Sequence, residues 1–111
     1  MKVFVSTLFL EDWQPAREDW EGEVENDQHS QELSAVVRST CRKLREATVV
    51  RRGRGNGVWV DLTEAEADWL HGEARYRWEF WLTDNYGVED RSTGRGYGLA
   101  AMRLAELIEK R

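Results

Sequence analysis

The chain has 111 residues, 41% of them hydrophobic and 33% charged, and its formal net charge is −5 at pH 7. This length allows one domain, residues 1–111, with a single core, and the twelve aromatic residues exclude a disordered chain. The single cysteine, Cys41, excludes an intramolecular disulfide framework and suits a reducing cytosol. Because no segment has the form of a signal peptide or the length of a membrane span, we expect a soluble cytoplasmic protein without membrane contact.

The charges are segregated along the chain. Residues 11–32 contain nine acidic side chains and one basic one, Arg17, whereas residues 38–54 contain seven basic side chains and one acidic one, Glu46. Such blocks either serve different partners or attract each other within the fold. The acidic total disfavours strong nonspecific binding to nucleic acid.

The first predicted element is a β-strand over residues 2–10, KVFVSTLFL, which is nearly continuous in β-compatible residues and is expected at the centre of a sheet. An acidic loop follows over residues 11–29, where a proline and a glycine interrupt any regular pattern. Trp13 and Trp20 stand alone in this loop. Each of them either fastens the loop to the core or anchors a binding partner.

A helix and a β-hairpin are predicted next. The helix covers residues 31–46, with Ser30 as its N-cap. Its apolar stripe consists of Leu33, Val36, Val37, Thr40, Cys41 and Leu44. The hairpin joins β runs at residues 48–50 and 58–62 around the segment GRGNG, residues 53–57, whose residue types tolerate positive φ.

Residues 63–85 open with Thr63 and Glu66, the spacing of a helix capping box. One helical stripe holds Ala67, Leu70, Ala74, Trp78, Trp81 and Leu82, and nearly opposite it lie Trp69, Tyr76 and Phe80. A helix that is aromatic on two sides is either sandwiched in its own domain or offers one side to a partner. Residues 75–83 also alternate as a strand would, but strong helix formers continue through Gly72 and favour one long helix.

The last predicted helix runs from about Tyr97 to Lys110, after a polar loop, VEDRSTGRG. At this boundary Arg91, Gly94 and Gly96 have the spacing of the acetyl-coenzyme-A-binding signature of the GNAT acetyltransferases, which the segment resembles. In that family the signature is a loop at a helix N-terminus, where free N–H groups hold a pyrophosphate. The resemblance implies an acyl-coenzyme-A enzyme, which we rank third among the functions.

No other motif indicates catalysis or a cofactor. His29, Cys41 and His71 lack metal-ligand spacing, so we expect no metal site and no catalytic residues. The hairpin tip is the best candidate for nucleic-acid contact, because arginine side chains on a glycine-rich β-ribbon suit phosphate oxygens. The residues concerned are Arg51, Arg52 and Arg54.

The C-terminal half, with its strand, Thr–Glu-rich helix start and RLAELIEKR ending, resembles small accessory proteins of actinobacterial bacteriophages. The resemblance lies in its Ala/Glu/Arg-rich composition and covers roughly the last fifty-five residues. It implies a protein that acts in the host cytoplasm by binding or inhibiting a host protein, or by regulating phage genes.

We therefore predict an α+β domain in which the opening strand and the hairpin form a small antiparallel or mixed sheet, packed by one helix and a C-terminal helical hairpin. The predicted function is non-enzymatic protein binding, as a homodimer or on a host or phage protein. The predicted contact residues are Trp13, Trp20, Trp69, Tyr76 and Phe80. Nucleic-acid binding through the basic block 38–54 is the alternative.

Overall fold

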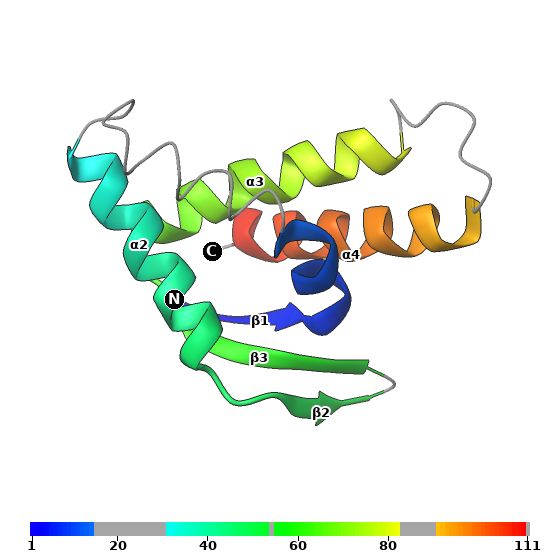
Figure 1. Cartoon of the computed structure of the whole chain (residues 1–111), viewed down its shortest axis with the longest axis horizontal. Coiled ribbons are helices and arrows are strands. Elements are labelled where there is room, and N and C mark those ends of the chain that lie inside the picture. Colours follow the sequence, from blue (N-terminus) through cyan, green and yellow to red (C-terminus); the bar gives the residue numbers. More distant parts are fainter. Residues whose placement is uncertain (15–30, 54, 83–90, 111) are drawn as a thin grey trace.

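The computed structural model describes residues 1–14, 31–53, 55–82 and 91–110 (Figure 1). It has the predicted α+β class, with a small antiparallel sheet and helices packed against it. In chain order the elements are β1 (Lys2–Ser6), a helix at residues 7–14, α2 (Gln31–Glu46), β2 (Val50–Arg52), β3 (Gly55–Asp61), α3 (Glu64–Leu82) and α4 (Arg91–Glu109). None of the helices in the described ranges is long and apolar enough to cross a membrane.

The sheet has the strand order β1-β3-β2, so the opening strand lies at an edge and the prediction of a central strand was wrong. Its partner β3 pairs with it in a register that sets Val3 opposite Val60 and Val5 opposite Val58. These four valines are buried and form the inner face of the sheet. The first strand needs no second strand beside it, because α4 runs along it and contacts it (Figure 1).

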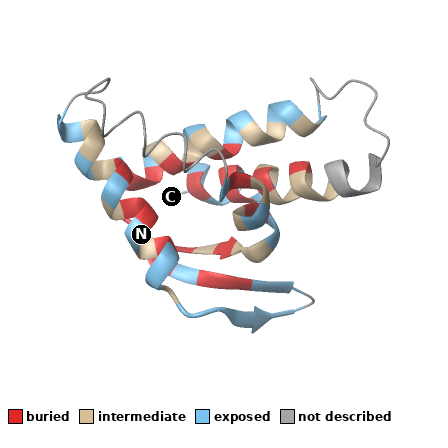
Figure 2. Ribbon diagram, in the orientation of Figure 1, coloured by how far each residue is buried: buried red, intermediate tan, exposed pale blue. Residues whose placement is uncertain are grey.

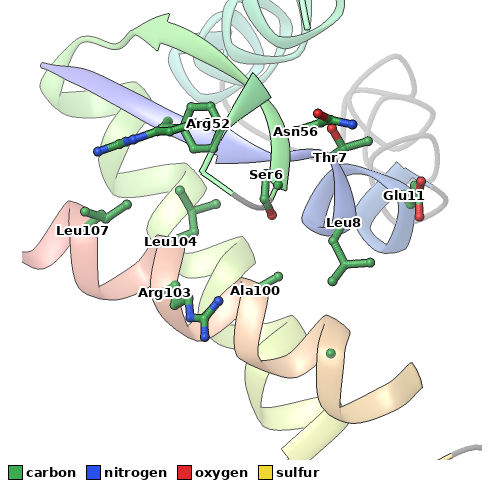
Figure 3. A pocket seen from close by; sticks show the side chains of 13 residues that line it. Ser6, Thr7, Leu8, Glu11, Arg52, Asn56, Ala100, Arg103, Leu104 and Leu107 are labelled. Carbon is green, nitrogen blue, oxygen red and sulfur yellow. The ribbon is translucent and has the colours of Figure 1, made fainter. Parts of the chain in front are cut away.

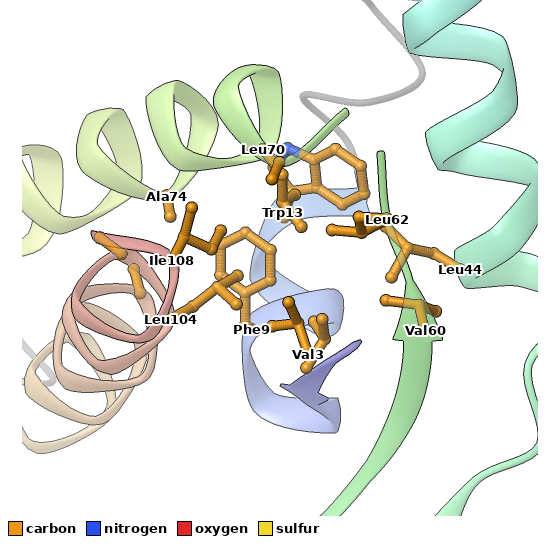
Figure 4. Packing of buried hydrophobic residues seen from close by; sticks show 14 of the residues in the cluster. Val3, Phe9, Trp13, Leu44, Val60, Leu62, Leu70, Ala74, Leu104 and Ile108 are labelled. Carbon is orange, nitrogen blue, oxygen red and sulfur yellow. The ribbon is translucent and has the colours of Figure 1, made fainter. Parts of the chain in front are cut away.

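The opening strand also ends earlier than predicted, at Ser6, and residues 7–14 are helical. The Ser6 hydroxyl accepts a hydrogen bond from the Phe9 amide at 3.2 Å, which is the geometry of a helix N-cap. The turn to helix brings Phe9 and Trp13, four residues apart, onto one face. Both are fully buried, with their rings stacked at a centroid distance of 5.7 Å (Figure 4).

The predicted helix at residues 31–46 and the predicted hairpin are both confirmed. The hairpin turn is tighter than the glycine-rich segment indicated, because Arg52 pairs directly with Gly55 and residues 55–57 belong to β3. Gly53 supplies the left-handed conformation that the turn needs, with φ of 59°. Every residue of β2 is exposed, in contrast to the inner part of β3 (Figure 2).

Residues 64–82 form one continuous helix, so the alternative of a strand at residues 75–83 was wrong. The capping box is confirmed: the Thr63 amide donates to Glu66 Oε1 at 2.8 Å and the Glu66 amide donates to Thr63 Oγ1 at 3.2 Å. The first two turns of the predicted stripe are buried, at Ala67, Leu70 and Ala74. Trp78 and Trp81 farther along are half-buried, and Leu82 is exposed.

The last helix begins at Arg91, earlier than the predicted start at Tyr97. It runs antiparallel to α3 and completes the predicted helical hairpin (Figure 1). Close packing against α3 explains a glycine at position 98, where a Cβ atom would lie 2.7 Å from Leu82. The predicted stripe is confirmed, because Ala101, Leu104, Ala105 and Ile108 are all buried (Figure 4). The acidic loop predicted for residues 11–29 begins as helix at 11–14, and the rest of it lies outside the described residues.

Candidate functional site

The aromatic residues predicted on the second side of α3 separate into two environments. Tyr76 is 61% exposed and Phe80 is 38% exposed, and they lie one turn apart on the outer side of the helix. Trp69 instead is half-buried and packs against the core, where its ring meets the Trp13 ring edge-on at 5.8 Å. The surface formed by Tyr76 and Phe80 is called the α3 aromatic face below.

A buried ion pair lies next to Phe80 of this face. The guanidinium of Arg77 donates to both carboxylate oxygens of Asp12, at 2.6 and 2.9 Å, and also stacks over the Phe80 ring at 4.8 Å. Trp81 donates its indole N–H to the same carboxylate at 2.8 Å. Since the Asp12 side chain is only 4% exposed, the pair joins helix 7–14 firmly to α3. No spacing in the sequence indicated this contact, because its partners are 65 residues apart.

Two further predicted contact residues cannot be assigned to a surface. Trp13 is fully buried, so it belongs to the core and the prediction that it anchors a partner is corrected. Its indole N–H donates to Glu73 at 3.2 Å, which fixes the ring between helix 7–14 and α3. The large indole ring is buried because it packs against the neighbouring apolar side chains of the core. Trp20 lies outside the described residues.

The outer face of the sheet carries an aromatic pair that sequence reasoning missed. Phe4 and Trp59 are directly opposite in the register of β1 and β3, with ring centroids 5.3 Å apart. The guanidinium of Arg52 lies over both rings, at 5.3 Å from Phe4 and 4.8 Å from Trp59. Arg51 is exposed beside it on β2, whereas Arg54 lies outside the described residues. The alternation of apolar residues in the two strands was the signal that could have revealed this face.

A groove of about 590 Å³ adjoins the same Phe4 and Arg52 side chains (Figure 3). One wall is formed by α4 and the other by the end of the sheet, and helix 7–14 closes the third side. Leu8, Ala100, Leu104 and Leu107 supply an aliphatic lining. Arg52 and Arg103 contribute two cationic side chains and Glu11 one anionic side chain. None of these residues except Arg52 was a candidate from the sequence.

The carboxyl group of Glu66 has a perturbed pKa and a structural role. Glu66 is buried, which raises the pKa of its carboxyl, but hydrogen bonds from Lys43, Ser39 and Thr63 more than offset this and lower the pKa to about 2. Lys43 lies 2.6 Å from one carboxylate oxygen and Ser39 2.6 Å from the other. The network joins α2 to the start of α3. A carboxylate held fully ionised by its neighbours is a poor proton donor or acceptor near neutral pH.

Within residues 1–14, 31–53, 55–82 and 91–110 no cluster of three His, Cys, Asp or Glu side chains could hold a metal ion. His71 makes a 2.7 Å contact with Glu109 that links α3 to α4 at the surface. The glycines of the GNAT-like segment, Gly94 and Gly96, lie inside α4 and not in a loop before it. The predicted pyrophosphate-binding loop is therefore absent at this position, because helical N–H groups beyond the first turn are already bonded.

Comparison of the chain with protein-family models, with curated proteins and with solved structures gave no match.

Proposed function

We propose that this chain is a non-enzymatic protein-binding domain and that its main contact is the α3 aromatic face. The observation that carries the proposal is the exposure of Tyr76, 61%, and Phe80, 38%, on a helix that otherwise covers its large aromatic side chains at least in part. Exposed aromatic residues that lie together are typical anchors of protein interfaces.

The rigidity of the face supports the same function. Arg77 is bound by Asp12 and stacks over Phe80, so that ring loses little side-chain freedom when a partner covers it. Preorganised aromatic side chains contribute more to affinity than mobile ones. The resemblance to phage accessory proteins extends the proposal to a host protein as the partner. Where no host protein is bound, the same face mediates self-association of the chain.

The test replaces both side chains, as Tyr76→Ser combined with Phe80→Ser. Because the two residues are exposed, we expect the circular dichroism spectrum and the unfolding transition to change little. Self-association, followed by sedimentation equilibrium, or capture of a partner from host lysate, followed by mass spectrometry, is expected to weaken by roughly tenfold or more.

Val49→Ser is the matched control, because it removes another exposed apolar side chain away from α3. It should leave both readouts unchanged. Collapse of the helical signal in the double variant would mean that Tyr76 and Phe80 are needed for folding. An intact variant with unaltered association and capture would equally refute the proposed contact.

Nucleic-acid binding is the second candidate, and the outer face of the sheet favours it. Single-strand binding surfaces combine exposed aromatic rings with cationic side chains, and on this face Trp59 is 41% exposed, with Lys2 6.0 Å and Arg52 4.8 Å from its ring centroid. Fluorescence anisotropy with labelled oligo(dT) and a duplex would test it. Binding should fall steeply between about 50 and 200 mM salt and be lost when Arg51, Arg52 and Arg54 are changed together to Ala. A chain that binds neither probe at low salt has no such function.

A further inference from the structure

We propose that the groove between α4 and the end of the sheet binds a short peptide segment of a partner protein, one that combines acidic and aliphatic side chains. This inference rests on the proposed protein-binding function and adds a second contact, which shares no residue with the α3 aromatic face.

The groove has the size and lining of a binding site. Its volume of about 590 Å³ falls within the range of sites that hold ligands. Leu8 and Leu107 line it and remain 41% and 45% exposed, so aliphatic side chains from helix 7–14 and from α4 are both open to solvent at the groove (Figure 3). On α4 the lining also includes two small residues, Gly96 and Ala100. Covering these leucines would remove apolar surface from water, which favours an occupant with aliphatic side chains.

The charges that line the groove indicate which charge the bound peptide carries. Arg52 and Arg103 both line it, and among the described residues neither is held in an ion pair or side-chain hydrogen bond. Arg52 is positioned by stacking on Phe4 and Trp59, which leaves the N–H edges of its guanidinium available. With Glu11 as the one acidic residue of the lining, the groove is cationic in a chain whose net charge is −5. Carboxylates are the complementary groups on a protein partner.

The lining favours a peptide over a nucleic acid. Bases bind by stacking on aromatic rings, but Arg52 already lies over the Phe4 ring, and the remaining apolar lining is aliphatic. Asn56, whose amide can donate to and accept from a peptide backbone, lies at the sheet end of the groove (Figure 3).

The test uses fluorescein-labelled short peptides and the full chain, with fluorescence anisotropy as the readout. The probe alternates leucine and glutamate. One control probe replaces each glutamate by lysine and a second replaces each leucine by serine. We expect the leucine–glutamate peptide to bind at least about tenfold more tightly than either control, because the first control opposes the arginines and the second lacks aliphatic contact.

Variants of the chain locate the binding. Arg52→Ala and Arg103→Ala should each weaken binding of the leucine–glutamate probe by roughly tenfold, and Leu107→Glu should abolish it by placing a carboxylate against the probe. Arg42→Ala is the matched control, because it removes the same charge from an exposed position on α2 outside the groove. Amide chemical shifts of Leu8, Ala100 and Leu107 should move on titration with the peptide.

Several results would overturn the proposal. One is that the leucine–glutamate probe does not bind at concentrations up to about 1 mM. Another is that Arg42→Ala and Arg103→Ala weaken its binding equally, and a third is that the amide chemical shifts change only at other surfaces. Displacement of the peptide by oligo(dT), with oligo(dT) the tighter ligand, would assign the groove to nucleic acid instead.

The outcome also separates this inference from the proposed function. If the Tyr76→Ser, Phe80→Ser variant loses its partner while Arg103→Ala keeps it, and the leucine–glutamate probe does not bind, the α3 aromatic face stands and the groove proposal fails. If Arg103→Ala loses the partner and the double variant keeps it, the groove stands and the α3 aromatic face fails.

Discussion

The carboxyl group of Glu66 shows how one residue can complete a helix start and join two helices. It accepts the Thr63 amide as part of the capping box and also accepts hydrogen bonds from Lys43 and Ser39 of α2. The Lys43 ammonium lies 2.6 Å from the carboxylate, and Glu66 as a residue is only 2% exposed. Without this carboxylate the Thr63 amide loses its acceptor, and Lys43 and Ser39 keep only the backbone carbonyls of Asp61 and Val36.

A pH dependence of stability follows from this network. The pKa of Glu66 is lowered from 4.5 to about 2, so folding favours the ionised form. The stabilisation is therefore complete above pH 4.5 and is lost as the pH falls from 4.5 towards 2. Its size is on the order of 3 kcal/mol. Glu66→Gln should be less stable than the native chain in urea denaturation at about pH 6, and the gap should shrink at about pH 3. A gap of equal size at both pH values would contradict this account.

At the scale of elements, helix 7–14 is attached to α3 by the ion pair of Asp12 and Arg77. Asp12→Asn keeps the shape of the side chain but leaves the buried guanidinium without its counter-charge, which costs about 3 kcal/mol or more. Urea denaturation should show this loss. Glu11→Gln makes the same charge change one residue earlier, at an exposed position, and should shift the free energy of unfolding by about 0.5 kcal/mol or less. Equal effects of the two substitutions on the free energy of unfolding would show that the ion pair contributes no more to stability than an exposed charge does.

The pairing of β1 with β3 depends on a glycine at position 57. A Cβ atom there would lie 2.5 Å from the Val5 carbonyl oxygen and 2.5 Å from the Phe4 ring. Gly57→Ala should therefore lower the free energy of unfolding by about 1–3 kcal/mol, because backbone must move. Gly55 belongs to the same strand and has open space around it, so Gly55→Ala is the control and should be tolerated. Thermal unfolding of the two variants distinguishes them, and similar midpoints would argue against the close approach.

At the scale of the whole molecule, each of the two charge blocks supplies a described residue to an ion pair with a residue outside both blocks. Asp12 of the acidic block pairs with Arg77, and Lys43 of the basic block pairs with Glu66. Arg51 and Arg52 at the hairpin stay exposed. Among the described residues, Asp12 and Lys43 thus take part in the packing of helices, while Arg51 and Arg52 lie at the surface used in the contacts proposed above.

Trp13 joins helix 7–14 to α3 within the core, since it stacks on Phe9 and meets Trp69 and Glu73. Trp13→Ala should remove about 3–5 kcal/mol of stability through the lost contacts and the cavity. Any loss of binding should then follow unfolding, as seen by comparing circular dichroism with partner capture. A variant that keeps its native unfolding midpoint and still loses its partner would restore the role of Trp13 as an anchor.

The sequence by itself determined those features that depend on neighbours in the chain. Residues 31–46 show helical period, Thr63 and Glu66 lie at capping distance, and a glycine-rich turn separates two β runs, so the helix, the capping box and the hairpin could all be predicted. The aromatic residues on two sides of residues 63–85 left open whether Tyr76 and Phe80 are covered within the domain or exposed, and the structure shows them exposed.

Only the tertiary structure decided which of several compatible local patterns was used. Residues 7–10 suit a strand, but burial of Phe9 with Trp13 favours a helix, and Ser6 caps it. Likewise α4 extends over glycines that read as a loop, because packing on α3 offsets their low helix propensity. The Asp12–Arg77 pair and the groove beside Arg103 unite residues far apart in the chain. Contacts of this kind arise from packing in three dimensions and leave no periodic trace in the order of the residues.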